Sequence, residues 1–167
     1  MPNTKGVFSP DYNVLKYLRV VRKYFQKRYN LSQFDLETCL FLYSERYFDF
    51  RKFREYARVG HPINRKYVKK LEEDGWIELY RMRKQYPKEV WRCTHKLKKM
   101  VNTFYKTLYG EYYIPEDRRK NPFFLAKWKQ NWWSQEVYKE AIMAMNDARK
   151  GLDNVYVYED GKRIRAK

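Results

Sequence analysis

One segment of the chain carries amide and basic side chains that can contact a nucleic acid: Asn64, Arg65, Lys66, Lys69 and Lys70. Asparagine can form two hydrogen bonds with an adenine edge, and arginine can form two with guanine. The first three side chains therefore suit base edges, while the two lysines one turn later suit backbone phosphates. Val68 and Leu71 occupy the opposite face, so we predict a helix over residues 64–74 with a basic, exposed outer face.

A second group of cations surrounds the turn between two predicted strands. Eight basic residues lie between Arg81 and Lys99, and Glu89 is the single acid among them. Those nearest the turn are Arg81, Arg83, Lys84 and Lys88. Arginine fits a narrow minor groove because the negative potential is stronger there. We therefore expect this hairpin to contact a DNA backbone or the minor groove beside the basic helix.

The whole chain is strongly basic, with 37 Lys and Arg against 20 Asp and Glu and a formal charge of +17. The excess is uneven, because residues 51–106 hold 17 basic and 6 acidic side chains while residues 31–50 hold 1 and 4. A field of this sign attracts polyanions, chiefly nucleic acid and acidic membrane surfaces. No apolar run is long enough to span a bilayer, so we expect duplex DNA as the partner. A solvated surface without a partner is the alternative.

Polar caps mark four of the expected helix starts: Ser9 before Pro10, Ser32 with Asp35 in a capping box, Asp49 and Thr94. The fourth helix is expected to start at Asn64 itself. The first and third helices are expected to end near Tyr29 and Arg58, and Gly75 and Gly110 to stop the fourth and fifth. The second helix is expected to bury Leu36, Cys39, Leu40 and Tyr43. The fifth is expected to bury Leu97, Val101, Phe104 and Leu108.

Two short strands are predicted between the fourth and fifth helices, at residues 76–81 and 89–93. A basic helix directly before a basic hairpin, in the order helix, helix, helix, strand, strand, helix, predicts a winged helix-turn-helix fold. We therefore expect a mainly α protein with a small β-hairpin wing, of the α+β class. Residues 1–110 would form the winged domain with its N-terminal helix, and residues 111–167 a C-terminal extension.

The predicted extension contains two helix signals and one hairpin signal. Asn121-Pro122 is expected to cap a helix through Trp128, and Ser134 another that ends at Gly151. Asp160-Gly161 lies between two short apolar or basic stretches and predicts a hairpin. The extension is also rich in tryptophan, with Trp128, Trp132 and Trp133. We expect it to be ordered and to offer a surface to a protein partner.

No set of residues predicts catalysis, a metal site or a cofactor site. Two histidines and two cysteines match no zinc pattern at these spacings, and no Gly-rich phosphate loop or nucleophile elbow is present. We therefore expect no enzymatic activity. Cys39 is expected to be an inert buried residue. Arg92 and Lys96 lie near Cys93 in the sequence, which suggests a lowered thiol pKa and the hypothesis of a redox switch.

The expected compartment is a reducing cytoplasm, where the protein would associate with the nucleoid. Two cysteines make no disulfide framework, and the first residues show neither the apolar run nor the cleavage site of a signal peptide.

Three stretches resemble the MarR family of winged-helix regulators: residues 31–34 with Leu36 and Leu40, residues 67–77, and Thr94 before a long amphipathic helix. The resemblance covers about residues 9–110. It implies a homodimer, built from the first and the late helices, that binds a palindromic DNA site and responds to a small molecule or a redox signal. The family's wing carries an Asp-x-Arg signature, whereas no Asp lies between Arg81 and Arg92 here. The chain beyond Glu111 is also longer than the family's final helix.

Two functions of different classes are therefore expected. The first is a homodimeric regulator of transcription whose affinity rests on phosphate contacts and falls steeply with salt. The second is a structural or architectural component of a nucleoprotein or phage assembly, located in the virion, that uses the winged module for non-specific DNA or protein contact. Binding of single-stranded RNA by stacking on aromatic side chains is a third alternative.

Overall fold

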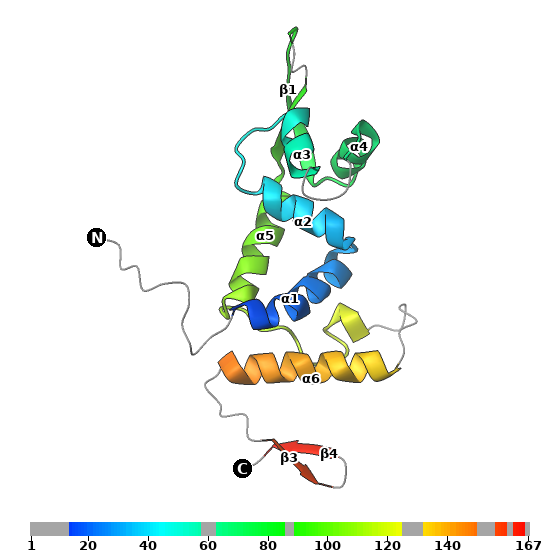
Figure 1. Cartoon of the computed structure of the whole chain (residues 1–167), viewed down its shortest axis with the longest axis vertical. Helices are drawn as coiled ribbons and strands as arrows, with labels where there is room; N and C mark the ends of the chain where they lie inside the picture. Colours follow the sequence, from blue (N-terminus) through cyan, green and yellow to red (C-terminus); the bar gives the residue numbers. More distant parts are fainter. Residues whose placement is uncertain are drawn as a thin grey trace, which may run out of the picture. The chain divides into compact units, whose positions relative to one another are not determined.

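The computed structural model describes residues 14–57, 63–85, 89–124, 132–149, 156–159 and 162–165. This described part is mainly helical and contains two small antiparallel hairpins (Figure 1). The chain divides into two compact units, one of residues 29–105 and the other of residues 1–28 with 106–167. The sequence predicted a division at residue 110, with the first helix in the winged domain. In the structure the first helix instead belongs to the same unit as residues 106–167. No described helix is long and apolar enough to cross a membrane.

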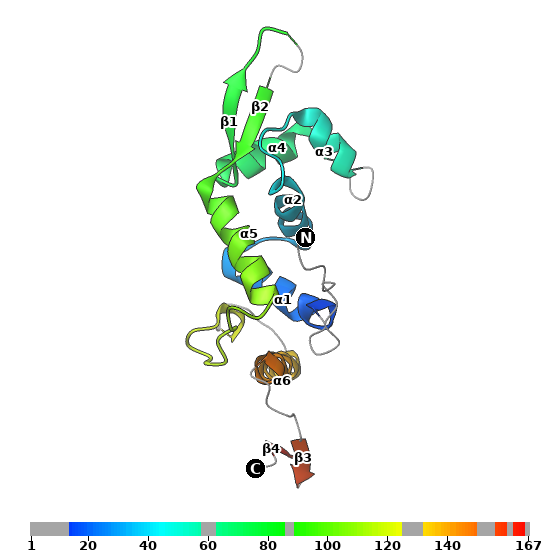
Figure 2. The same ribbon diagram turned by 90° about the vertical axis from the view of Figure 1, so that its left-hand side faces the viewer.

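The unit of residues 29–105 holds the basic segments. Its elements are α2 (Gln33–Leu42), α3 (Phe50–Ala57), α4 (Arg65–Glu73), β1 (Ile77–Met82), β2 (Glu89–Cys93) and most of α5 (His95–Leu108). This is the predicted order of helices and strands. Figures 1 and 2 show the β1–β2 hairpin projecting beyond α3 and α4.

The start of α2 is the predicted capping box. Ser32 Oγ accepts a hydrogen bond from the Asp35 backbone N–H at 3.0 Å, and Asp35 Oδ2 accepts one from the Ser32 N–H at 3.2 Å. Leu36 and Cys39 are buried as expected, but the expectation for Tyr43 is wrong, because its side chain is 37% exposed and Leu42 is buried instead. A helix has 3.6 residues per turn, so the face predicted from spacings of three and four residues drifts along the helix and is least accurate in its last turn.

The connection from α4 to α5 is built from the residues that were expected to end and start helices. Gly75 has φ +74°, and the bonds from Gly75 N to Glu72 O and from Trp76 N to Leu71 O form a Schellman motif. Thr94 Oγ1 donates to the Gly75 and Trp76 carbonyls at 2.8 and 2.9 Å and accepts from Leu97 N at 3.3 Å. One threonine therefore holds the end of α4 beside the start of α5.

The β1–β2 hairpin is antiparallel and irregular in its middle. Leu79 pairs with Trp91 and Arg81 with Val90, so Tyr80 is an extra residue in β1, which is the arrangement of a β-bulge. The first strand begins at Ile77, one residue later than predicted. A third segment joins the sheet at Phe48, which exchanges backbone hydrogen bonds of 3.0 and 2.8 Å with Trp91.

The core of this unit is continuous and aromatic. Phe53 is fully buried and lies 5.4 Å from Phe48 and 6.2 Å from Trp91, measured between ring centroids. The apolar residues expected on α5 are all buried: Leu97, Val101 and Phe104 in this unit, and Leu108 in the part of α5 that belongs to the other unit. Burial of such side chains contributes roughly 1.5–3 kcal/mol each. The hairpin and the helices are thus parts of one packed structure.

The other unit contains α1 (Val14–Tyr29, in this unit up to Arg28), the short 3₁₀ helix η1 (Pro122–Phe124), α6 (Trp132–Arg149), β3 (Tyr156–Glu159) and β4 (Lys162–Arg165). The expected Ser134 cap is wrong, because α6 already begins at Trp132. The register Glu159 opposite Lys162 confirms the predicted hairpin. Ser9, Pro10, His61, Trp128 and Gly151 lie outside the described residues.

Two side chains of α6 fix the chain that follows α5. Arg149 donates hydrogen bonds to the carbonyls of Thr107, Leu108 and Tyr112, the last at 3.1 Å. A guanidinium placed there satisfies carbonyls that a helix end leaves without partners. Asn146 Nδ2 donates to the Ile114 carbonyl and to Glu116 Oε1, both at 2.9 Å.

Both cysteines are buried and free, which overturns the redox hypothesis for Cys93. Burial raises the pKa of the Cys93 thiol to about 11, and the lowering effect of Lys98 is smaller. Cys93 Sγ instead donates a hydrogen bond to the Leu42 carbonyl at 3.3 Å. Burial also raises the pKa of Cys39, in agreement with its expected inert role. Closeness in sequence to Arg92 and Lys96 does not place their charges beside the thiol.

The folded protein is therefore expected to resist alkylation at both cysteines at neutral pH, because a buried, protonated thiol is a poor nucleophile. Iodoacetamide labelling followed by mass spectrometry should find Cys39 and Cys93 unmodified without denaturant and both modified in urea. Rapid labelling of Cys93 alone in the native protein would contradict this placement.

Candidate nucleic-acid interface

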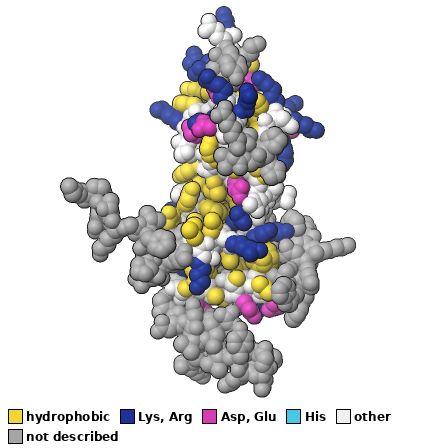
Figure 3. Space-filling model, in the orientation of Figure 1, with side chains coloured by type: hydrophobic (Ala, Val, Ile, Leu, Met, Phe, Trp, Pro, Cys, Tyr) yellow, Lys and Arg dark blue, Asp and Glu magenta, His cyan; other side chains and the backbone are white. Residues whose placement is uncertain are grey.

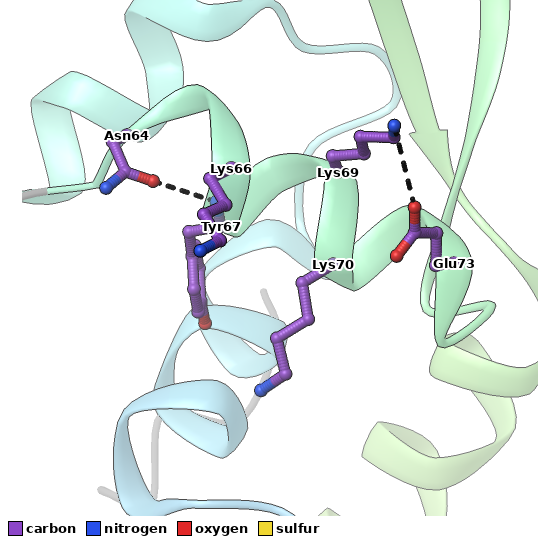
Figure 4. Close-up of a pocket in the computed structure, with 6 residues that line it drawn as sticks. All are labelled: Asn64, Lys66, Tyr67, Lys69, Lys70 and Glu73. Carbon is purple, nitrogen blue, oxygen red and sulfur yellow. Dashed lines mark hydrogen bonds and ion pairs between the residues drawn. The ribbon is translucent and has the colours of Figure 1, made fainter.

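The outer face of α4 is basic, as the sequence predicted. Val68 and Leu71 are buried and attach the helix to the core, while Arg65, Lys66, Lys69 and Lys70 are all exposed. Figure 3 shows Lys and Arg side chains gathered over α4 and over the projecting hairpin. Side chains of this face line an open depression: Asn64, Lys66, Tyr67, Lys69, Lys70 and Glu73 (Figure 4).

Asn64 is the N-cap of α4 and not its first helical residue. Its backbone is extended, and its Oδ1 accepts a hydrogen bond from the Tyr67 backbone N–H at 2.9 Å (Figure 4). Two hydrogen bonds to adenine would need this same oxygen. The cap therefore competes with base contact at Asn64, a conflict that the residue type alone does not show.

Tyr67 and Lys70 connect α4 to α2 (Figure 4). The Tyr67 ring lies 5.2 Å from the Phe34 ring, and its hydroxyl donates to Thr38 Oγ1 at 3.3 Å. Burial raises the pKa of Tyr67, so the hydroxyl stays protonated and able to donate. Lys70 Nζ lies 3.3 Å from Asp35 Oδ2. These contacts between Tyr67, Lys70 and α2 help to set the orientation of α4.

Asp35 is buried, and yet it is charged. Burial by itself raises its pKa, but the hydrogen bonds from Ser32, the nearby Tyr67 hydroxyl and the charge of Lys70 outweigh that effect, so the pKa lies below its ordinary value. A buried carboxylate persists only with such compensation. One side chain therefore serves both as the acid of the α2 capping box and as the anion that holds Lys70.

The remaining cations of α4 differ in how they are held. Arg65 Nη1 lies 2.7 Å from Glu89 Oε2, and its guanidinium lies 5.5 Å from the centroid of the Phe50 ring. Lys69 Nζ lies 3.8 Å from Glu73 Oε1, an exposed pair that contributes little to stability. Lys66 is exposed and makes no ion pair with any residue that the structure describes.

The order of charges along α4 opposes the helix dipole. Arg65 and Lys66 lie in the first turn, which contains no acid, while the last turn holds Glu72 and Glu73 together with one base, Lys70. Acids near the N-terminus and bases near the C-terminus would stabilise a helix, by about 0.3–1 kcal/mol each. The observed order instead concentrates positive potential at the N-terminal end, where exposed backbone N–H groups also favour anions.

The hairpin supplies part of the second predicted group of cations. Arg81, Arg83 and Lys84 are exposed, whereas Lys88 lies outside the described residues. Lower on the hairpin, Arg92 Nε lies 2.5 Å from Glu78 Oε1, and its guanidinium lies 5.3 Å from the centroid of the Tyr80 ring. The described cations near the turn and those of α4 belong to the same unit.

Three contacts at this site were not predicted from the sequence: Asp35 with Lys70, Glu89 with Arg65, and Phe48 with Trp91. All three join residues far apart in the chain, and periodicity reports only on neighbours. One signal was available, because Glu89 is the single acid in a basic stretch. In the described part of the chain no three His, Cys, Asp or Glu residues form a group that could hold a metal ion.

No protein-family model, no curated protein and no solved structure matches this chain.

Replacing Asp35 by Asn is expected to lower the free energy of unfolding by about 1–3 kcal/mol at neutral pH, since the variant loses hydrogen bonds to a charged group. The folded-state pKa of Asp35 is lowered, so its stabilisation is complete above the unfolded-state pKa of about 4 and is lost as the pH falls through the folded-state value. Urea unfolding at several pH values should therefore show the two proteins converging in acid.

Glu73→Gln is the matched control, because it removes a carboxylate from α4 that is exposed. It should change the free energy of unfolding by less than about 1 kcal/mol. An equal loss of unfolding free energy in the two variants would show that the burial of Asp35 does not explain its contribution to stability.

Proposed function

We propose that residues 29–105 form a winged helix-turn-helix domain that binds duplex DNA, with α4 in the major groove and the β1–β2 hairpin as the wing. The proposal rests on the exposed basic face of α4. Basic residues in its first turn reduce the stability of the helix but favour a bound anion at its N-terminal end. A helix with only a structural role gains nothing from that order.

The order of elements supports this domain type. A first helix, α2, is followed by the single bridge at Phe48, then by α3 and α4, and then by two antiparallel strands. The bridge gives the hairpin a third, minimal strand at its base. In helix-turn-helix proteins the second helix of the motif enters the major groove, and its N-terminal residues contact base edges. Here those residues are Arg65 and Lys66.

The contacts divide into positioning and specifying roles. Lys66, Lys69 and the hairpin cations would neutralise phosphates, which sets affinity and its salt dependence. Arg65 would contact a guanine edge, and Asn64 would keep α4 capped. As a homodimeric regulator of transcription, the protein would place two such helices about 34 Å apart on a palindromic site.

The double variant Lys66→Ala with Lys69→Ala should weaken binding to duplex DNA because two phosphate contacts are lost. Fluorescence anisotropy with a random-sequence duplex at several salt concentrations should show a salt slope smaller by about 0.9 for each contact. The control is Lys98→Ala with Lys99→Ala, which removes the same charge from exposed positions on α5. If the two pairs weaken binding equally, net charge explains binding and α4 has no special role.

The hairpin variant Arg83→Ala with Lys84→Ala should weaken binding to all duplexes by a similar factor. Phosphate contacts carry no sequence information, so the ratio of affinities for a selected and a random duplex should stay constant. A competition assay with the two duplexes measures this ratio. A clear fall in the ratio would mean that the hairpin reads bases or groove width.

A second candidate, an architectural component of a nucleoprotein assembly, is favoured by an aromatic cluster at the hairpin. Tyr47 and Tyr80 lie 4.3 Å apart between centroids and are 39% and 47% exposed. Arg46 lies over the first ring and Arg92 over the second. Exposed aromatic surface rimmed by charge is typical of protein-interaction sites. Equal affinity for all duplexes, abolished by salt, would support this candidate over a regulator.

A further inference from the structure

Glu89 is the one acid between Arg81 and Lys99, and it faces the first residue of α4. It is the first residue of β2, and its carboxylate accepts a hydrogen bond from Arg65 Nη1 at 2.7 Å. The Arg65 guanidinium also lies over the Phe50 ring, the first residue of α3. Three elements therefore constrain one arginine whose side chain is still 68% exposed.

A constrained arginine differs from a free one in two ways. Holding a long side chain in one geometry before binding reduces the entropy lost on binding. A guanidinium has five N–H donors, so one ion pair leaves donors available for a second acceptor. The neighbouring carboxylate also cancels part of the positive charge, which weakens attraction to phosphates that carry no sequence information.

We propose that Glu89 is a specificity-determining positioning residue: it holds Arg65 toward a base edge and keeps this arginine from phosphates. The inference rests on the proposed function, because it assumes that α4 lies in the major groove. Glu89, an acid of the hairpin, would then determine how well the protein discriminates between DNA sequences and not only how tightly it binds.

The same hairpin contains a matched ion pair that lacks this geometry. Glu78 lies 2.5 Å from Arg92, and both are strand residues that face each other across the hairpin. Glu78→Gln and Glu89→Gln change the net charge equally, and each releases one arginine. Only Glu89→Gln releases an arginine of α4.

The experiment compares the full-length parent with Glu89→Gln and Glu78→Gln. Duplexes enriched by the parent from a random pool are compared with the unselected pool by fluorescence anisotropy at several salt concentrations. Glu89→Gln should bind the unselected pool with a salt slope steeper by about 0.9 and lose about 10-fold in the ratio of selected to unselected affinity. Glu78→Gln should keep the ratio of the parent.

Two further variants separate positioning from charge and from folding. Glu89→Asp keeps the charge but shortens the reach, so it should lose discrimination without a steeper salt slope. In an Arg65→Ala background, Glu89→Gln should leave the ratio unchanged, because the arginine it positions is gone. Circular dichroism melting verifies that each variant is folded, and Glu89→Asp replaces Glu89→Gln if the latter does not fold.

The outcomes distinguish this inference from the function on which it rests. If the parent binds no duplex above background, the proposed function fails. If the parent binds duplexes but enriches no sequence, or if Glu89→Gln and Glu78→Gln keep the same ratio, the role of Glu89 is wrong and DNA binding stands. A loss confined to Glu89 variants and absent without Arg65 supports the inference.

Discussion

The basic helix of this protein is oriented by a single buried carboxylate. Asp35 is charged in a place where charge is costly, and it remains so because groups from α2 and α4 surround it. A rotation of α4 about its axis would separate Lys70 and Tyr67 from Asp35 and leave the buried charge with the Ser32 hydrogen bonds alone. The outward direction of Lys66 and Lys69 is therefore tied to the contacts that Tyr67 and Lys70 make with α2.

Local stability and surface chemistry are divided between different residues of α4. The Asn64 cap, the Schellman motif at Gly75 and the buried pair Val68 and Leu71 hold the helix. The cations of its first turn, Arg65 and Lys66, oppose the helix dipole. A helix of nine residues is only marginally stable by itself. Because the caps and the buried residues hold α4, its surface can carry an order of charges that would destabilise an isolated helix of this length.

Local signals in the sequence predicted most of the elements, and non-local contacts account for what was missed. The capping box at Ser32, the turn at Gly75 and the cap at Thr94 depend on neighbours within a few residues, and all three are confirmed. Tyr43 and Ser134 were assigned from spacing and residue type, but Tyr43 is exposed and α6 begins two residues before Ser134. The basic face was predictable from periodicity. The ion pairs that organise it, and the high pKa of Cys93, depend on which distant segments the fold brings together.

The division of the chain has a consequence for the order of folding during synthesis. The unit of residues 29–105 is continuous, whereas the other unit joins residues 1–28 to residues 106–167. The continuous unit is complete as soon as its last residue has left the ribosome, and it can fold then. The first helix is made before α2 to α5, yet its own unit is completed only after them, since Arg149 and Asn146 follow the continuous unit in the chain. Until then the apolar residues Val21 and Phe25, both buried in the finished protein, belong to a nascent chain that still lacks most of their unit.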